Sequence, residues 1–161
     1  MDVKLIDDMP AEEVKARLNA NMTEEMQVTE AYYTDGKLTD MKWLSYDIRI
    51  TTGGASEELA ARCEELLSSD EVLVVKKKKS GELGAPVNIR SGIREVKCSY
   101  SGGELVIGCV LSADASAFLN PEYIVKSLKE AGLVLTSPDL LSEYYSVMRL
   151  AAFKDDMTEF R

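Results

Sequence analysis

A pair of adjacent glycines between two alternating runs is the feature that most constrains the fold of this chain. Gly102 and Gly103 suit the positive φ angles of a two-residue hairpin turn. Centring a hairpin on them predicts three cross-strand pairs: Tyr100 with Leu105, Cys98 with Ile107, and Val96 with Cys109. One face of the hairpin is then wholly apolar or aromatic, so register and burial agree. The sequence therefore predicts an antiparallel hairpin with one buried face.

Hydrophobic periodicity predicts the other elements beyond residue 45. Tyr46, Ile48 and Ile50 alternate with polar residues, which is typical of a half-buried strand. Helices are expected at 57–68, after the capping residue Ser56, and at 121–131, before Gly132. Further strands are expected at 71–79 and 145–153, although the pattern of residues 148–152 fits a helix equally well. A loop is expected at 80–86, and a short turn or helical segment at 88–93.

The residue pattern in the first third of the chain predicts a β-α-β arrangement. Val3–Ile6 is expected as a strand, and Pro10 starts a helix whose buried stripe would be Val14 and Leu18. Met26–Tyr32 alternates as a second strand does. Such a half unit leaves a sheet edge and a helix face uncovered, so we expect self-association or domain exchange through residues 1–45.

These elements place the chain in the α+β class. Residues 45–153 follow the ferredoxin-like β-α-β-β-α-β plan with an added strand, residues 1–44 form the β-α-β half unit, and residues 154–161 form a polar tail.

Composition excludes several kinds of site. The 161 residues contain no histidine, which removes Ser-His and Cys-His nucleophile pairs and every histidine-ligated metal site. Cys63, Cys98 and Cys109 are too far apart for a CxxC pair and are expected to be buried free thiols. Paired acids fall at helix faces, helix ends or the tail, where solvation is the expected role. We therefore predict no metal site and no cofactor.

The start of the chain shows no basic leader before an apolar run, and the longest apolar stretch is far shorter than a membrane span. We expect a cytoplasmic protein without a membrane partner.

The basic residues gather in one segment of an acidic chain. Residues 71–100 carry a net charge of +4, whereas residues 1–70 carry −9 and residues 101–161 carry −4. The candidate binding residues in this segment are Lys77, Lys78, Lys79, Arg90 and Arg94. Three interpretations stay open: lysines that protect a sheet edge, contacts to phosphate or RNA, and contacts to a protein partner. No aromatic residues interleave with the basic ones, as a stacking RNA platform would require.

The stretch KKKKSGELGAPVNIRSGI, residues 76–93, resembles the basic strand, Lys-Gly loop and D-I-R-P-L-I-like motif of the radical-SAM-linked protein family, a bacterial domain of unknown function. The start MDVKL, followed by a P-A-E-E-V helix, resembles the middle of that family. Asn88 stands where the family favours aspartate, and Ser91 where it favours proline.

The resemblance implies that this chain is a truncated form, covering the C-terminal two-thirds of the family. The family's N-terminal half carries histidine-containing segments resembling S-H-L-D and F-N-P-H-P. Members of the family occur beside or fused to a radical SAM protein. This context implies an accessory or substrate-presenting role.

Our leading hypothesis is therefore a partner module of a radical SAM protein, with no catalysis by this chain alone. The first alternative is an RNA-binding module for tRNA or rRNA that uses residues 76–97. The second is a fragment of an enzyme whose active site lies in the absent N-terminal half.

Overall fold

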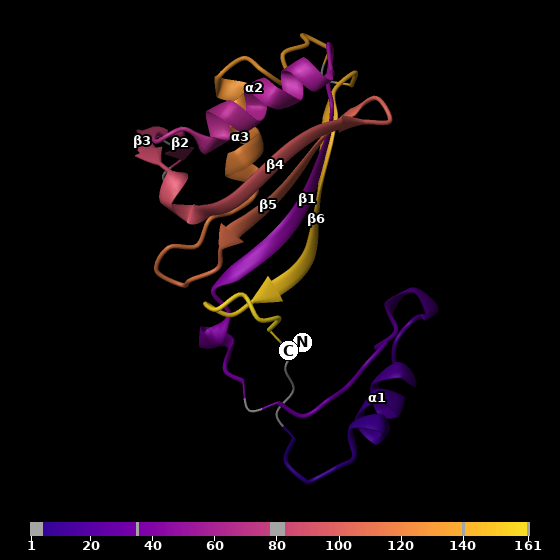
Figure 1. The fold of residues 1–161 in the computed structure, drawn as a ribbon. Helices are drawn as coiled ribbons and strands as arrows, with labels where there is room; N and C mark the ends of the chain where they lie inside the picture. Colours follow the sequence, from indigo (N-terminus) through magenta and orange to yellow (C-terminus); the bar gives the residue numbers. More distant parts are fainter. Residues whose placement is uncertain (1–4, 35, 78–82, 140, 161) are drawn as a thin grey trace. The chain divides into compact units, whose positions relative to one another are not determined.

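A computed structural model describes residues 5–34, 36–77, 83–139 and 141–160 (Figure 1). The chain divides into two compact units, residues 1–36 and residues 37–161. Each unit is described by itself below.

The first unit is built on one helix, α1 (Ala11–Asn19). Pro10 precedes the helix, and Glu12 and Glu13 lie in its first turn, where acids complement the positive helix end. The predicted helix is confirmed. None of its residues is fully buried, however, so the expected stripe of Val14 and Leu18 is only half-buried.

The strands predicted on either side of α1 are not present in the described residues. Residues 27–32, beyond the short 3-10 helix η1 (Glu24–Met26), are irregular. The side chain of Asn19 accepts from Val28 N at 2.7 Å and donates to Val28 O at 3.0 Å, so it occupies the two groups that a neighbouring strand would use. Leu5 and Ile6 are also irregular, and the rest of the first predicted strand lies outside the described residues. The expectation of a β-α-β half unit was therefore wrong in this part of the chain.

The second unit contains a four-stranded antiparallel sheet with the order β4-β5-β1-β6. Its strands are β1 (Trp43–Thr51), β4 (Ile93–Ser101), β5 (Glu104–Ser112) and β6 (Tyr144–Phe153). The 3-10 helix η2 (Leu38–Asp40) precedes β1. The alternation predicted for β1 is confirmed, because Tyr46, Ile48 and Ile50 are buried on one face. The chain is thus an α+β protein.

The predicted hairpin joins β4 to β5 in the expected register. Tyr100 pairs with Leu105, Cys98 with Ile107, and Val96 with Cys109. Gly102 and Gly103 have φ angles of 61° and 88°, the left-handed values that a glycine pair in such a turn adopts without strain.

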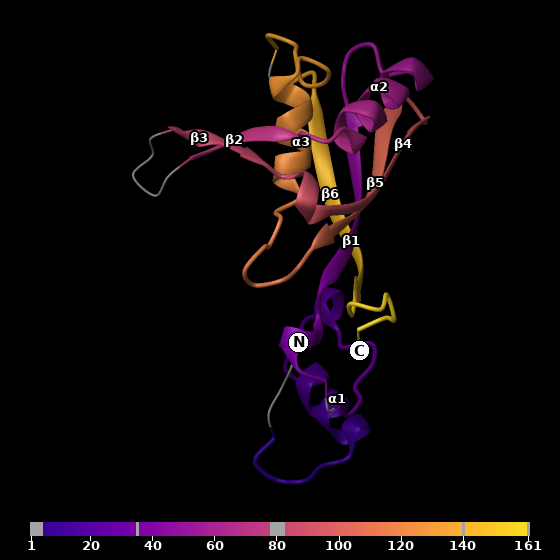
Figure 2. The same cartoon turned by 60° about the vertical axis from the view of Figure 1, so that its left-hand side comes forward.

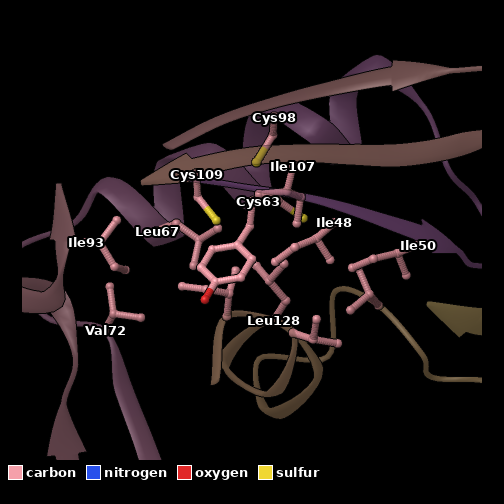
Figure 3. Packing of buried hydrophobic residues seen from close by; sticks show 14 of the residues in the cluster. Ile48, Ile50, Cys63, Leu67, Val72, Ile93, Cys98, Ile107, Cys109 and Leu128 are labelled. Atoms are coloured by element: carbon pink, nitrogen blue, oxygen red, sulfur yellow. The ribbon is translucent and has the colours of Figure 1, made fainter. Parts of the chain in front are cut away.

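Two helices cover the same face of this sheet (Figure 1). Helix α2 (Glu57–Ser68) begins at Ser56, whose hydroxyl accepts from Leu59 N at 3.2 Å. Helix α3 (Glu122–Glu130) ends before Gly132, which has a φ of 69°. Both predicted helices are confirmed. Leu67 and Leu128 pack from the helices onto Ile48 and Ile107 in one hydrophobic core (Figure 3).

A separate two-stranded sheet lies between α2 and β4 in the sequence. It pairs β2 (Leu73–Lys77) with β3 (Leu83–Asn88), and Figure 2 shows this hairpin projecting beside α3. The ammonium of Lys126 on α3 donates to Val75 O and holds the hairpin in place. Two expectations were therefore wrong: β3 replaces the later part of the predicted loop at 80–86, and the strand at 71–79 does not add to the main sheet. The helical segment predicted at 88–93 is confirmed as η3 (Arg90–Gly92).

The C-terminal residues fold back along the end of β6. Phe160 N donates to Ala152 O at 2.8 Å, and Lys154 N donates to Thr158 O at 2.9 Å. Phe153 and Glu159 form an isolated bridge.

The hairpin turn gives a test of the fold. Gly103→Ala should lower the free energy of unfolding by about 1–2 kcal/mol, because an L residue is strained at this positive φ. Gly108→Ala is the matched control: a Cβ there would meet nothing within 4 Å, so we expect no loss and a gain of up to about 1 kcal/mol. Urea denaturation of both variants measures the difference, and equal stabilities would contradict the assigned turn.

Candidate functional site

A shallow depression of about 620 Å³ lies across β4, β5 and β1. Its lining combines basic, apolar and small polar residues. They are Ser45, Tyr46, Ser68, Arg90, Ile93, Arg94, Glu95, Val96, Lys97, Gly108, Cys109, Val110 and Leu150.

Gly108 explains part of this hollow. It lies on β5 between Asp47 of β1 and Lys97 of β4, its partners in the two neighbouring strands. These positions alternate with the buried ones, so they belong to the sheet face that the helices leave open. Because glycine has no side chain and nothing stands within 4 Å of where a Cβ would be, the sheet is indented there.

The structure brings two of the five predicted site residues together. Arg90 and Arg94 both line the depression, along with Lys97 from the same basic segment. Lys77 is the last residue of β2. Lys78 and Lys79 lie outside the described residues.

Arg90 is positioned by the backbone around η3. Its guanidinium Nη1 donates to Ile93 O at 2.5 Å. The side-chain oxygen of Asn88 accepts from Arg90 N at 2.9 Å and from Val72 N at 3.0 Å, while its Nδ2 donates to Asp70 O at 3.1 Å. This position requires an acceptor for two backbone N–H groups, a requirement that either asparagine or aspartate meets.

Arg94 is positioned by a bulge and an aromatic ring. The pairing of β4 with β5 shifts register between Ile93 and Glu95, which leaves Arg94 as the extra residue. Its guanidinium carbon lies 5.1 Å from the centre of the Trp43 ring, within the range of a cation–π interaction. The Trp43 Nε1 is buried and has no hydrogen-bond partner within the described part of the chain.

The charge and apolar character of the depression suit a surface that carries both acidic and apolar groups. Arg90, Arg94 and Lys97 outnumber the one carboxylate in the lining, Glu95. Val110 and Leu150 supply apolar surface, and the Leu150 side chain is 61% exposed. A site of this kind binds by charge complementarity and apolar contact.

The three cysteines are buried free thiols, as predicted, and lie near one another in the core (Figure 3). Burial raises the pKa of the Cys63 thiol to about 11 and the pKa values of Cys98 and Cys109 to about 12. Thiols with such values remain protonated at neutral pH and are poor nucleophiles.

The described residues contain neither a metal-binding cluster nor a membrane-spanning helix. No group of three or more cysteine, aspartate or glutamate residues in this part of the chain is arranged to hold a metal ion. Nor does this part contain a helix with the length and hydrophobicity needed to cross a bilayer.

Sequence reasoning missed Trp43 and Gly108 as parts of the site. Trp43 falls in residues 38–44, where the pattern is ambiguous between a helical turn and a loop. Gly108 interrupts an apolar run, and a glycine inside a strand is a known signal of a bulge or a close approach. That signal was available in the sequence.

Asn88 provides a test of how Arg90 is held. Asn88→Ala should destabilise the protein by about 1–3 kcal/mol, because two backbone N–H groups lose their acceptor. Asn21→Ala is the control: the Asn21 side chain is exposed and donates to Arg17 O at 2.9 Å, so its loss should cost no more than about 0.5 kcal/mol. Thermal denaturation compares the two, and a neutral Asn88→Ala would refute this role.

Thiol labelling tests the core. In native protein at about pH 8, a disulfide reagent such as DTNB should react slowly with all three cysteines, because the thiols are buried and protonated. In denaturant, all three should react quickly. Rapid reaction of any one thiol in the native state would contradict its placement in the core.

The chain was compared with known proteins. No curated protein sequence and no solved structure matches it. Residues 1–121 match a family described as uncharacterised proteins conserved in bacteria, DUF2344. That description names no activity or partner, so the link to radical SAM proteins and the coverage of a C-terminal part stay predictions. Because the match spans most of the sequence, the chain belongs to the DUF2344 family of bacterial proteins.

Proposed function

We propose that this chain is a non-catalytic binding module that docks a protein partner over the basic depression. The observation that carries the proposal is the convergence of Arg90 and Arg94 on one open hollow with apolar walls. Both guanidinium groups are held in place, one by Ile93 O and the other by the Trp43 ring. Preorganised arginines lose little freedom on binding, which favours their use at interfaces.

The composition of the depression favours a protein over RNA. An RNA surface uses exposed aromatic rings among its basic groups. The only aromatic residue in the lining is Tyr46, which is 7% exposed. Arg94 covers a face of the Trp43 ring, so that face is not available to a base.

The partner we propose is a radical SAM protein, and the proposed role is that of an accessory or substrate-presenting module. The support for this partner is the resemblance of residues 76–93 to the radical-SAM-linked family. Lys77 is the last residue of β2, and Lys78 and Lys79 come next in the sequence; we assign all three to the same interface. The proposed site of action is the cytoplasm, where free thiols such as Cys63 persist.

The architecture of residues 43–153 supports a ferredoxin-like plan with the β2–β3 hairpin as an insertion. Strands β1 and β4 run parallel with β5 between them, and β5 and β6 run parallel with β1 between them. Each pair is connected through a helix, so two split β-α-β units interlock in one sheet.

Arg94→Glu tests the proposal. Binding to the radical SAM protein of the same bacterium should weaken by about tenfold or more, because the change places a second carboxylate beside Glu95 in the depression. Arg62→Glu is the matched control: Arg62 is exposed on α2 and does not line the depression, so affinity should stay within about threefold. Isothermal titration calorimetry measures both.

The same titration with tRNA and rRNA distinguishes the alternative. Tight RNA binding that falls steeply with salt, without binding to the protein, would replace the proposed function with an RNA-binding one. Binding to the protein that is equally strong for both variants would place the interface elsewhere.

A further inference from the structure

The free edge of β6 exposes several large apolar side chains. β6 is an outer strand of the sheet, and six of its first seven residues are exposed. They include Tyr144, Met148 and Leu150, at 61%, 63% and 61% exposure. Within the described residues, the C-terminal segment pairs only with the end of this edge, around Ala152 and Lys154.

The opposite edge of the sheet is protected. Along β4 the side chains of Arg94, Glu95 and Lys97 carry charge at or near the surface. The carboxylate of Glu64 on α2 accepts from Cys98 N at 2.7 Å and so occupies an edge N–H group. Charged side chains and blocked backbone groups are the usual protection of an edge strand. In β6, Arg149 is the single charged residue.

We propose that the β6 edge pairs with the β6 edge of a second copy of this chain, in an antiparallel dimer with its two-fold axis at Val147. Such pairing is self-complementary and closed, as a two-fold interface requires. It would continue the four-stranded sheet of one copy into that of the other.

Charge complementarity selects this register. An axis at Val147 places Arg149 of one copy opposite Tyr145 of the other. The hydroxyl of Tyr145 donates to the carboxylate of Glu122 at the start of α3. The guanidinium of Arg149 in one copy therefore faces the carboxylate of Glu122 in the other, and the two-fold axis repeats this favourable pair. In the part of the chain that the structure describes, Arg149 has no ion pair of its own. A register centred on Arg149 would instead place two like charges opposite each other, which is destabilising.

This register also brings exposed side chains of the two copies together on one face of the sheet. Met148 lies opposite Ser146, and Leu150, the extra residue of a bulge in the pairing of β6 with β1, lies next to Tyr144 of the other copy. These four residues are all exposed in the single chain. Their apolar surface gains cover when the second copy is present.

Sedimentation velocity of the full chain across a dilution series tests the dimer. The wild type should dimerise at or below about 100 μM, because an unprotected edge pairs readily. Arg149→Glu and Glu122→Arg should each weaken dimerisation by about tenfold or more, because each places like charges together. Mixing the two variants should restore dimers to within about threefold of wild type, since the carboxylate introduced in one variant then meets the guanidinium introduced in the other.

The mixing result separates pairing from general damage, because a misfolded variant would not be restored by another one. Amide hydrogen exchange gives an independent measurement without substitution: exchange in residues 144–150 should slow as the concentration of wild type rises. Val28→Lys is the control, since it tests association through residues 1–45 and should leave this dimer unchanged. A monomeric wild type at about 100 μM, or mixed variants no tighter than each alone, would overturn the proposal.

Discussion

Burial of one face of the four-stranded sheet under α2 and α3 is the constraint on which the rest of the second unit depends. Ile48, Ile107, Leu67 and Leu128 are fully buried in this layer. Each such side chain contributes about 1.5–3 kcal/mol by leaving water. Because the helices occupy that face and the β4 edge is protected, the sheet offers its opposite face and its β6 edge for binding.

Elements whose hydrophobic residues recur on one buried face could be predicted from the sequence. The hairpin register followed from the glycine pair. Centring the turn there pairs Cys98 with Ile107 and puts the apolar residues of both strands on the same face of the sheet. The helices at α2 and α3 followed from capping residues and helical spacing. In these segments local propensity and long-range packing agree, which is the condition under which sequence reasoning works best.

Elements without a buried partner could not be predicted in the same way. Residues 27–32 alternate as a strand does, but Asn19 occupies the backbone groups of Val28. The segment of β3 reads as a loop because it contains Gly84 and Pro86, and its burial pattern shows no alternation. For the site, Arg90 and Arg94 were anticipated as basic residues. Their convergence depends on η3, a bulge and the Trp43 ring, which are features of the three-dimensional fold.

We propose that a partner binds the open face of the sheet at the depression around Gly108. The most direct measurement is a titration of the ¹⁵N-labelled chain with the radical SAM protein, followed by NMR. We expect the largest changes in the amide signals of Arg94, Glu95 and Gly108, and small changes along α3. Changes confined to α3 or to residues 1–36, or no changes at all, would contradict binding at this depression.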